Sequence, residues 1–267
     1  MMTTMDRVRE HYKESCEHFP EDRIVGIFLQ GSQNYKLQLP TSDVDTKLIV
    51  VPTFEDIAKN RKAVSTTHIR ANEEHIDFKD IRLYIETFRK QNLNFLEILF
   101  TRYQMLNSLY EEEWTRLIDA REFIAHMNLH RAVKSMKGIA LEKYHAMEHP
   151  YPSKLEILQR YGYDPKQLHH LVRVDDFLMR FLDDEPYESC LVPTGETHEF
   201  LMDLKQGRYE LAEARDLAKI TLEHVVAVAD AFCDKVPEKE EAWCRELLED
   251  VSYNIMKIAT KKELMML

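Results

Sequence analysis

Two short apolar runs near the start of the chain, separated by a polar stretch, predict a pair of strands. The first run, residues 24–29, is rich in β-branched side chains and is too short for a helical pattern before Gly31 follows. The second run extends from Val44 to Val51 and stops at Pro52, which cannot donate to a sheet ladder. The pattern therefore indicates a strand, a loop that opens at Gly31-Ser32, and a second strand.

The chain up to residue 108 alternates between helical and extended patterns. We expect helices or helical turns at 4–19, 54–61, 81–88 and 93–99, and extended segments at 64–68 and 75–78. The short apolar alternation at 75–78 is expected to form a strand that pairs beside the second strand. The sequence therefore predicts a small mixed β-sheet with helices around it.

Beyond residue 108 the extended patterns end and long helical patterns follow. Proline and glycine signals separate the expected helices, which span 109–122, 123–147, 153–161, 165–183, 197–205, 209–234 and 238–264. The change of pattern predicts two domains, 1–108 and 109–267. The predicted fold class is α+β, with a small mixed β-sheet domain followed by an all-helical C-terminal domain.

Composition limits the class of protein. With 267 residues and 44% hydrophobic content the chain can bury a sizeable core, and a formal net charge of −11 argues against a surface coated with nucleic-acid-binding side chains. The four cysteines are scattered without a Cys-x-x-Cys pair, so neither a zinc knuckle nor a disulfide framework is indicated. The N-terminus is charged, and no stretch approaches the roughly 18 apolar residues that span a bilayer. We therefore expect a soluble protein of the reducing cytoplasm, without a membrane partner and of undetermined oligomeric state.

The charge is distributed unevenly along the chain. Residues 129–173 contain eight Lys and Arg side chains but only four Asp and Glu side chains. An excess of positive charge in an acidic protein predicts that this helical segment faces phosphate groups.

Three carboxylates are the candidate reactive groups. Residues two apart on a strand share a face, so the side chains of Asp43 and Asp45 should point to the same side of the sheet. The pairing of 75–78 beside the second strand brings Asp77 near them. Carboxylates that converge at a sheet edge can hold two divalent cations about 4 Å apart, and their hard oxygens suit Mg²⁺ or Mn²⁺. A third carboxylate can also accept the proton of an attacking hydroxyl.

The turn beside these carboxylates suits a phosphate group. Gly31 allows a close backbone approach that a side chain would obstruct, and Ser32 adds a hydroxyl and an N–H group. Together with the carboxylates these parts describe nucleotidyl transfer. The sequence has no Gly-rich Walker loop, dinucleotide fingerprint or His-Glu-x-x-His motif, which removes the basis for P-loop, Rossmann and zincin interpretations.

Each motif also has a purely structural interpretation. An isolated Gly-Ser is usually a turn and an isolated Asp-x-Asp is often a solvated strand end, so the combination with strand placement is what points to chemistry. Glu73, Glu74 and Asp80 compete with Asp77 for the role of third carboxylate. The motif Asn94-x-x-Glu97 more often marks a helix cap than a site.

The combination of Gly31-Ser32, Asp43-x-Asp45 and Asp77 resembles the three-part signature of the DNA polymerase β-like nucleotidyltransferase superfamily. The similarity is closer to one branch, the predicted nucleotidyltransferases of bacteria and phages. It covers most of the chain, through the runs GSQNYKLQLPTSDVDTKLIVVP, IDFKDIRLYIETFRKQNLNFLEIL and RYGYDPKQLHHLVRV. This resemblance implies a nucleotidyltransferase fold and NTP chemistry, with poorly defined acceptors.

The resemblance assigns roles to the N-terminal residues. Gly31 and Ser32 would hold the triphosphate, Asp43 and Asp45 would ligate the metals, and Asp77 would complete the metal site and assist the acceptor hydroxyl.

A second block of the resemblance lies in the helical part. It comprises Tyr163, Asp164, Lys166, His169 and Arg173. A helix from Pro165 places the last three, with His170, on one side at spacings of three and four residues. Lys166, His169 and Arg173 would then close over the nucleotide, whereas the structural interpretation is an exposed polar helix face. We expect one of the adjacent histidines to be packed or solvated.

The loop after the glycine departs from the branch. Related proteins often have a glycine after the tyrosine, where this chain has Lys36-Leu37. Tyr35 is a candidate to stack on a nucleobase, and a loop tyrosine that covers the core is the alternative.

The predicted function is transfer of a nucleoside monophosphate from an NTP such as ATP to a hydroxyl, with release of pyrophosphate and with Mg²⁺ or Mn²⁺ as cofactor. An RNA end, such as that of tRNA, is a reasonable acceptor given the basic segment, and a small molecule or a protein hydroxyl is left open. Two alternatives are a non-catalytic nucleotide-binding sensor module and a nucleotide-sugar glycosyltransferase that uses Asp-x-Asp. The intact carboxylates disfavour the first, and the small size of the sheet domain disfavours the second.

Overall fold

The computed structural model describes residues 2–266 and divides into two compact units. The first unit comprises residues 1–127 together with 240–267, and the second comprises 128–239. The boundary expected at residue 108 falls inside the first unit. Two contacts explain the difference: Trp114 packs against Phe28 of the sheet with ring centroids 4.8 Å apart, and the last helix of the chain returns to the first unit.

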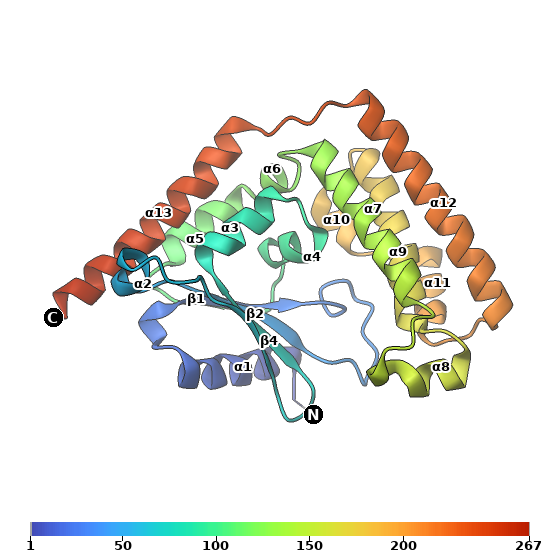
Figure 1. Ribbon diagram of the computed structural model, residues 1–267, viewed down its shortest axis with the longest axis horizontal. Helices are drawn as coiled ribbons and strands as arrows, with labels where there is room; N and C mark the ends of the chain where they lie inside the picture. The colour runs from blue at the N-terminus through green and yellow to red at the C-terminus, as the bar shows by residue number, and fades with distance from the viewer. Residues whose placement is uncertain (1, 267) are drawn as a thin grey trace. The chain divides into compact units, whose positions relative to one another are not determined.

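The first unit is built on a five-stranded mixed sheet among the described residues (Figure 1). Its strands are β1 (Ile24–Gln30), β2 (Asp45–Val50), β3 (Ser65–Ile69), β4 (His75–Asp80) and β5 (Gln104–Leu106). The order across the sheet is β3-β4-β2-β1-β5, in which β2 and β4 run parallel and the other neighbours are antiparallel. The expected strand pair and the pairing of 75–78 beside β2 are confirmed, and the α+β fold class with a small mixed sheet is confirmed with them.

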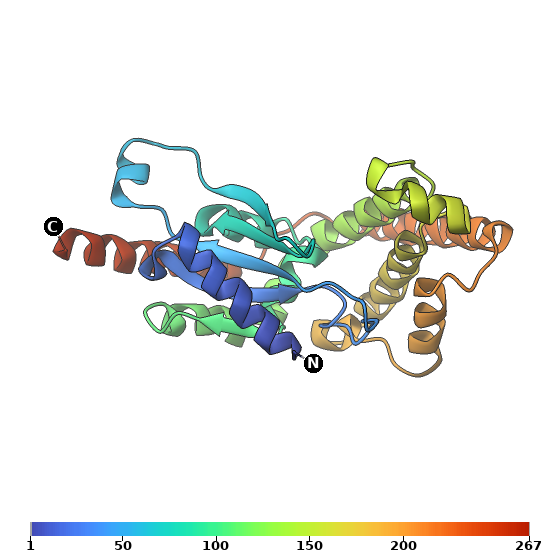
Figure 2. The ribbon, with the colours of Figure 1, turned by 90° about the horizontal axis from the view of Figure 1, so that it is seen from below.

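Helices cover both faces of this sheet, as the two views show (Figures 1 and 2). The helix α1 (Thr4–His18) lies on one face, where Val8 joins a core cluster with Leu48 and Ile76. The opposite face is covered by α3 (Ile81–Arg89), α4 (Leu93–Leu96) and α5 (Glu111–Asp119). The short α2 (Phe54–Ala58) follows β2, α6 (Arg121–Ala125) follows α5, and α13 (Ala242–Met265) packs on α3 and α5.

The second unit is entirely helical in its described residues. It contains α7 (Leu129–Ala146), α8 (Leu155–Tyr161), α9 (Pro165–Leu182), α10 (Tyr187–Leu191), α11 (Gly195–Lys205) and α12 (Leu211–Lys235). The helix α9 is central and packs against α7, α10, α11 and α12. Its N-terminus is capped by Asp164, and Pro165 occupies the first turn, where a missing N–H costs nothing.

Three local features differ from the sequence-based expectations. The expected helix 123–147 is interrupted, because the Asn128 side chain accepts a hydrogen bond from Arg131 N and caps a new helix there. The strand β5 and the helix α10 were not expected, since runs of three and five residues are too short for a periodic pattern. Within residues 2–266 all four cysteines are free thiols, and none of the helices is both long and apolar enough to cross a membrane.

Candidate functional site

The backbone of the turn that follows β1 is hydrogen-bonded to a buried carboxylate. Gly31 adopts a φ of 103°, and a Cβ atom built there would meet nothing within 4 Å, so the turn borders open space. Its N–H donates to Oε1 of Glu97, a fully buried residue, at 2.9 Å. The carbonyl oxygen of Ser32 accepts hydrogen bonds from Tyr35 N at 3.2 Å and Leu37 N at 2.9 Å. The backbone around Gly31-Ser32 is therefore fixed from both sides.

Side chains of the loop tie its two ends together. Gln33 Nε2 donates to the carbonyl of Asp43 at 2.7 Å. Asn34 Nδ2 donates to the carbonyl of Leu29 at 3.0 Å, and its Oδ1 accepts from Thr101 Oγ1 at 2.7 Å. The loop that the sequence predicts as a phosphate-binding turn is thus an ordered structure that brings residues 31–34 next to Asp43.

The loop keeps a glycine-like conformation at the position where it departs from the resembling proteins. Lys36 has a φ of 58°, in the left-handed region that favours glycine. A lysine in this conformation carries a strain of about 1–2 kcal/mol. The neighbouring Tyr35 is buried, with 3% of its surface exposed, which matches the interpretation of a core-covering tyrosine.

The two aspartates of Asp-x-Asp lie beside the turn. Asp45 is the first residue of β2 and is paired in register with Gln30, the last residue of β1. Its Oδ1 accepts a hydrogen bond from His75 N at 3.0 Å. Asp43 is exposed, and its carboxylate forms no hydrogen bond or ion pair with the described residues. Both side chains are therefore accessible at the edge where β1 ends and β2 begins.

A buried network around Glu74 fixes the residue between these aspartates. Oε1 of Glu74 accepts from Val44 N at 3.1 Å and contacts Arg7, and the residue is 1% exposed. Oε2 accepts from Arg70 Nη1 at 2.7 Å and from His11 Nε2 at 3.0 Å. Glu74, named as a competitor of Asp77 for the catalytic carboxylate, is thus a residue that positions the Asp-x-Asp segment.

The histidine of this network is neutral at neutral pH. Burial, reinforced by Arg70 and Arg7, lowers the pKa of His11 to about 4. A neutral imidazole that faces a carboxylate must carry its proton on Nε2, so Nδ1 accepts from Thr46 Oγ1 at 2.9 Å. The contact between His11 and Glu74 is therefore a hydrogen bond between a neutral donor and a carboxylate.

Asp77 shares a sheet face with Asp45 but is held by other groups. It pairs with Lys47 across the parallel ladder and with Thr67 across the antiparallel one. Lys47 Nζ lies 3.0 Å from Oδ2, and Thr67 Oγ1 donates to Oδ1 at 2.6 Å. Burial would raise the pKa of Asp77, but the Lys47 ammonium and the Thr67 hydroxyl outweigh it, so the pKa is lowered and the group is ionised.

The three aspartates differ in how well they suit a metal ion. Asp43 and Asp45 offer hard oxygens in accessible positions, which suits Mg²⁺ or Mn²⁺. Both oxygens of Asp77 are engaged, Oδ2 by Lys47 and Oδ1 by Thr67. Among residues 2–266 no group of three His, Cys, Asp or Glu side chains is arranged to hold a metal ion. That Asp43, Asp45 and Asp77 together form one metal site stays a prediction.

A strip of charged side chains, formed by Asp45, Lys47, Asp77 and Lys79, lies on this sheet face. The ammonium groups of Lys47 and Lys79 lie 4.3 and 4.2 Å from the centroid of the Phe95 ring. Lys47 is 3% exposed, and burial lowers the pKa of both lysines. The hydroxyl of Tyr84, which borders the same strip, is buried without a hydrogen-bond partner among the described residues.

The second block of the resemblance lies in the second unit and has mainly structural contacts. Tyr163 is buried and donates its hydroxyl to the carbonyl of Tyr209 at 2.9 Å, and Asp164 caps α9 through Lys166 N. The side chain of Lys166 is exposed, whereas Arg173 is 3% exposed.

The histidines of this block are neutral. His169 is fully buried and donates from Nδ1 to the carbonyl of Leu201, 2.8 Å away. Burial lowers the pKa of His169 to about 3 and that of His170 well below its usual value. Neither imidazole therefore offers a positive charge to a phosphate at neutral pH. That Lys166, His169 and Arg173 close over a nucleotide stays a prediction.

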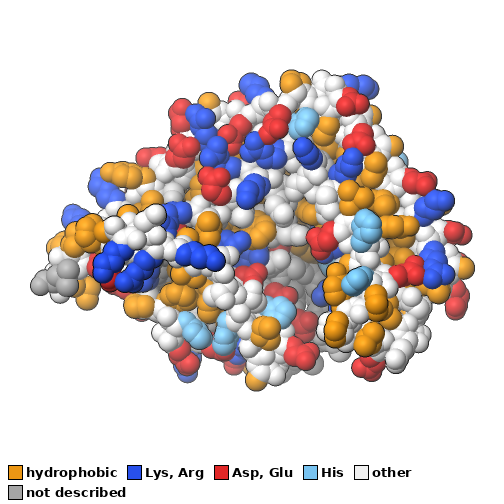
Figure 3. Space-filling model, in the orientation of Figure 1, with side chains coloured by type: hydrophobic (Ala, Val, Ile, Leu, Met, Phe, Trp, Pro, Cys, Tyr) orange, Lys and Arg blue, Asp and Glu red, His pale blue; other side chains and the backbone are white. Residues whose placement is uncertain are grey.

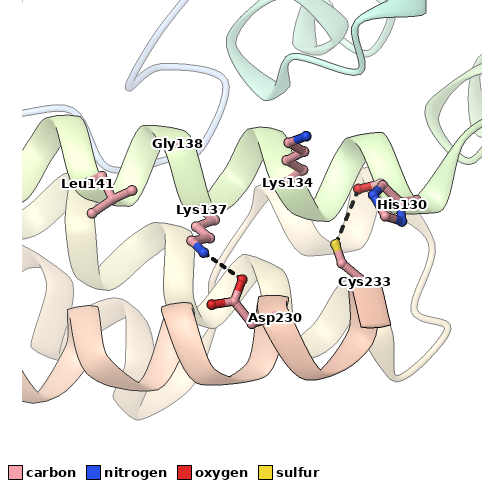
Figure 4. Close-up of a pocket in the computed structure, with 7 residues that line it drawn as sticks. All are labelled: His130, Lys134, Lys137, Gly138, Leu141, Asp230 and Cys233. Atoms are coloured by element: carbon pink, nitrogen blue, oxygen red, sulfur yellow. Dashed lines mark hydrogen bonds and ion pairs between the residues drawn. The ribbon is translucent and has the colours of Figure 1, made fainter. Parts of the chain in front are cut away.

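The basic segment 129–173 is partly neutralised by acids from elsewhere in the chain. Arg131 pairs with Glu238 and Lys137 pairs with Asp230, both outside the segment. A hollow of about 350 Å³ lies between α7 and α12 at this place (Figure 4). Figure 4 shows Lys137 reaching to Asp230 while Lys134 points away from α12. A count of charges along the sequence therefore overestimates the basic surface here.

Three contributing residues were missed or assigned a different role from the sequence. Lys47 follows Asp45 by two positions in an apolar run, and a charged residue there shares the face of the aspartate. Glu97 lies within the apolar run Leu96–Leu99, where a buried carboxylate requires a partner. Glu74 was noted only as a rival of Asp77. For Lys47 and Glu97 the signal is a charged side chain at a position that the pattern marks as buried, whereas Glu74 follows a polar turn and carries no such signal.

Comparisons with known proteins give little further guidance. No protein-family model matches the chain, and no curated protein is significantly similar to it. The crystal structure of a nucleotidyltransferase-like protein from Exiguobacterium sibiricum 255-15 matches over 87% of this chain and 78% of its own, with 14% sequence identity and a TM-score of 0.30. A TM-score of this size is too low to support a conclusion about this chain.

Proposed function

We propose that the first unit is a nucleotidyltransferase that moves a nucleoside monophosphate from an NTP to a hydroxyl group. The observation that supports this most directly is the register of β1 and β2, which sets Gly31-Ser32 beside Asp43 and Asp45 at one sheet edge. The turn borders open space at Gly31, which leaves room for phosphate groups, and accessible carboxylates accommodate divalent cations. The resemblance of the same residues to the nucleotidyltransferase signature agrees with this proposal.

In the proposed reaction the acceptor oxygen forms a bond to the α-phosphorus, and the bond from that phosphorus to the bridging oxygen breaks. Pyrophosphate leaves, and the hydroxyl proton is taken up by a base. Ser32 would bind the triphosphate, and Gly31, whose own N–H is bonded to Glu97, would leave room for its close approach. Mg²⁺ or Mn²⁺ held by Asp43 and Asp45 would stabilise negative charge on the phosphate oxygens.

Asp77 has a narrower role in this proposal. It is ionised and can accept a proton, but the lowered pKa makes it a weak base. We assign it to orienting the acceptor hydroxyl, with Lys47 and Thr67 fixing its carboxylate. The acceptor is proposed to be an RNA end, and a protein or small-molecule hydroxyl would use the same chemistry.

A nucleotide-binding module without turnover is the second candidate. It is favoured by one observation, the engagement of both Asp77 oxygens by Lys47 and Thr67. Metal-dependent NTP binding without pyrophosphate release would identify it.

The test follows the fate of label from two forms of each NTP. The protein is incubated with Mg²⁺ and either α-labelled or γ-labelled NTP, together with total RNA, cell protein or a small-molecule extract. Transfer of the α-label to one of these acceptors, with the γ-label released as pyrophosphate, is expected. Label from the γ-position on the acceptor, or consumption of a nucleotide-sugar in place of an NTP, would contradict the proposal.

A further inference from the structure

The last helix of the chain has two apolar stripes, and only one of them is covered. The buried stripe of α13 includes Leu248, Val251 and Ile255, which face the rest of the first unit. On another side of the helix large apolar residues are exposed, among them Tyr253 at 58% and Met265 at 77%. A single buried stripe is sufficient to anchor a helix, so a second one indicates a further contact.

The exposed stripe forms one wall of a groove of about 720 Å³. Its lining residues from α13 are Tyr253, Met256, Lys257, Thr260, Lys261, Leu264 and Met265, and Ile57 of α2 and Arg82 of α3 complete it. The residues on α13 recur at intervals of three and four over twelve positions, a length of about 18 Å. This repeat is the spacing at which one helix seats another.

The walls of the groove are fixed in place. The N-terminus of α2 is attached to α13, because Phe54 N donates to Oε2 of Glu263 at 2.9 Å. Arg82 is held by Asp80 through contacts of 2.7 and 2.9 Å. The hollow is therefore bounded by three elements that are bonded to their neighbours, and it does not depend on a single mobile side chain.

The charge on the groove is positive in an otherwise acidic chain. Its lining contains Lys257, Lys261 and Arg82 but no carboxylate, and because Arg82 is paired with Asp80, the two lysines carry the positive charge. Neither lysine forms an ion pair with the described residues, and the Lys257 ammonium lies 5.7 Å from the centroid of the Tyr253 ring. On the face shown in Figure 3, hydrophobic and Lys or Arg side chains gather around the C-terminal end of α13. An occupant must therefore combine an apolar surface with negative charge.

We propose that this groove is the docking site of an acidic amphipathic α-helix from a protein partner. A second copy of the chain is disfavoured, because a two-fold contact through this stripe would bring Lys257 and Lys261 against their own counterparts. A membrane surface is disfavoured because the site is concave, whereas a helix about 10 Å wide fits a groove. Apolar side chains of the partner at spacings of three and four would fill the groove, and its Glu or Asp residues would pair with the two lysines.

The proposal is tested with a designed peptide, independently of any enzymatic activity. The probe is a fluorescently labelled 18-residue helix with leucines at spacings of three and four and glutamates beside them. Its comparison peptides are a lysine twin, in which every glutamate is lysine, and a scrambled acidic peptide of the same composition without the stripe. Binding to the full chain is measured by fluorescence anisotropy. We expect the acidic helix to bind at least tenfold more tightly than either comparison peptide.

A charge-reversal variant makes the test specific to the groove. In the double variant Lys257→Glu, Lys261→Glu the preference should invert, so that the lysine twin binds at least tenfold more tightly than the acidic helix. The matched control is Lys219→Glu, an exposed lysine on α12, which should leave the preference unchanged. In the wild-type chain the methyl resonances of Met256 and Met265 should shift on binding.

Several results would overturn the proposal. One is equal binding of the acidic helix and its scrambled form, which would indicate non-specific electrostatics. Others are binding of phosphatidylserine vesicles in place of the peptide, self-association that the double variant abolishes, and unchanged preference in that variant.

Discussion

Replacing Glu74 by Gln tests whether a buried carboxylate holds the Asp-x-Asp segment in place. Glu74 accepts hydrogen bonds on both oxygens, from donors that include Val44 N, His11 Nε2 and Arg70. Val44 N and Arg7 face Oε1, whereas His11 and Arg70 face Oε2. The NH₂ group of a glutamine would face one of these two sets of donors. In the less costly orientation the amide nitrogen faces Val44 N, and a buried N–H is left without its acceptor.

The magnitude follows from these losses. An unsatisfied buried N–H costs about 1–3 kcal/mol. The lost charge pairing with Arg7 and Arg70 adds about 1 kcal/mol, discounted because their side chains are 28% and 16% exposed. The free energy of unfolding should therefore fall by about 3 kcal/mol. At a slope of about 3 kcal/mol per molar urea, the midpoint should fall by about 1 M.

The assay is urea unfolding at pH 7, followed by tryptophan fluorescence. Both tryptophans of the chain, Trp114 and Trp243, lie in the first unit, so the signal reports on the unit that contains Glu74. The matched control is Glu73→Gln, the same chemical change at the neighbouring exposed residue, which should alter stability by less than about 0.5 kcal/mol. A loss of less than about 1 kcal/mol in the Glu74 variant would refute the assigned role.

Three further predictions concern other parts of the site. At Lys36, where φ is 58°, the Gly variant should be about 1 kcal/mol more stable than the Ala variant in urea unfolding, since both remove the side chain and only glycine avoids the strain; equal stability would contradict this. The imidazole of His11 should stay neutral down to about pH 5 in an NMR titration, because its pKa is lowered to about 4. Since an unfolded histidine titrates near pH 6.5, this group adds no pH dependence above that value and removes about 3 kcal/mol of stability as the pH falls from 6.5 to 4. Titration of His11 near pH 6.5 in the folded protein would contradict both the lowered pKa and this loss of stability. Lys47→Met removes the ammonium from Asp77, so the pKa of that carboxyl should rise in a carbon-13 NMR titration, and an unchanged pKa would exclude the ion pair as its cause.

The sequence was most informative where neighbouring residues decide the structure. The apolar runs at 24–29 and 44–51 predict β1 and β2 because short β-branched runs between turn signals have few alternatives. The split at Asn128 and the strand β5 were missed, since a single capping side chain and a three-residue edge leave no periodic trace.

The site was less predictable, because its supporting contacts join distant residues. Gly31 and Glu97 are 66 positions apart, and Val44 and Glu74 are 30 apart, so no local pattern relates them. The parallel pairing of β2 and β4 brings Asp77 to the correct face, as expected, but the pattern could not show that Lys47 occupies it. Side-chain partners are set by the register of the strands, which requires the three-dimensional structure.

The central claim is that the edge formed by Gly31-Ser32 and Asp43-x-Asp45 transfers nucleotides, and the rate of pyrophosphate release from γ-labelled NTP tests it most directly. The rate is measured with Mg²⁺ for the wild-type chain and for Asp45→Asn, whose folding is checked by urea unfolding. The account predicts at least a hundredfold lower rate for the variant at unchanged stability, because the carboxylate that the proposal assigns to the metal is lost. Pyrophosphate release at the wild-type rate by a folded Asp45→Asn variant would contradict it.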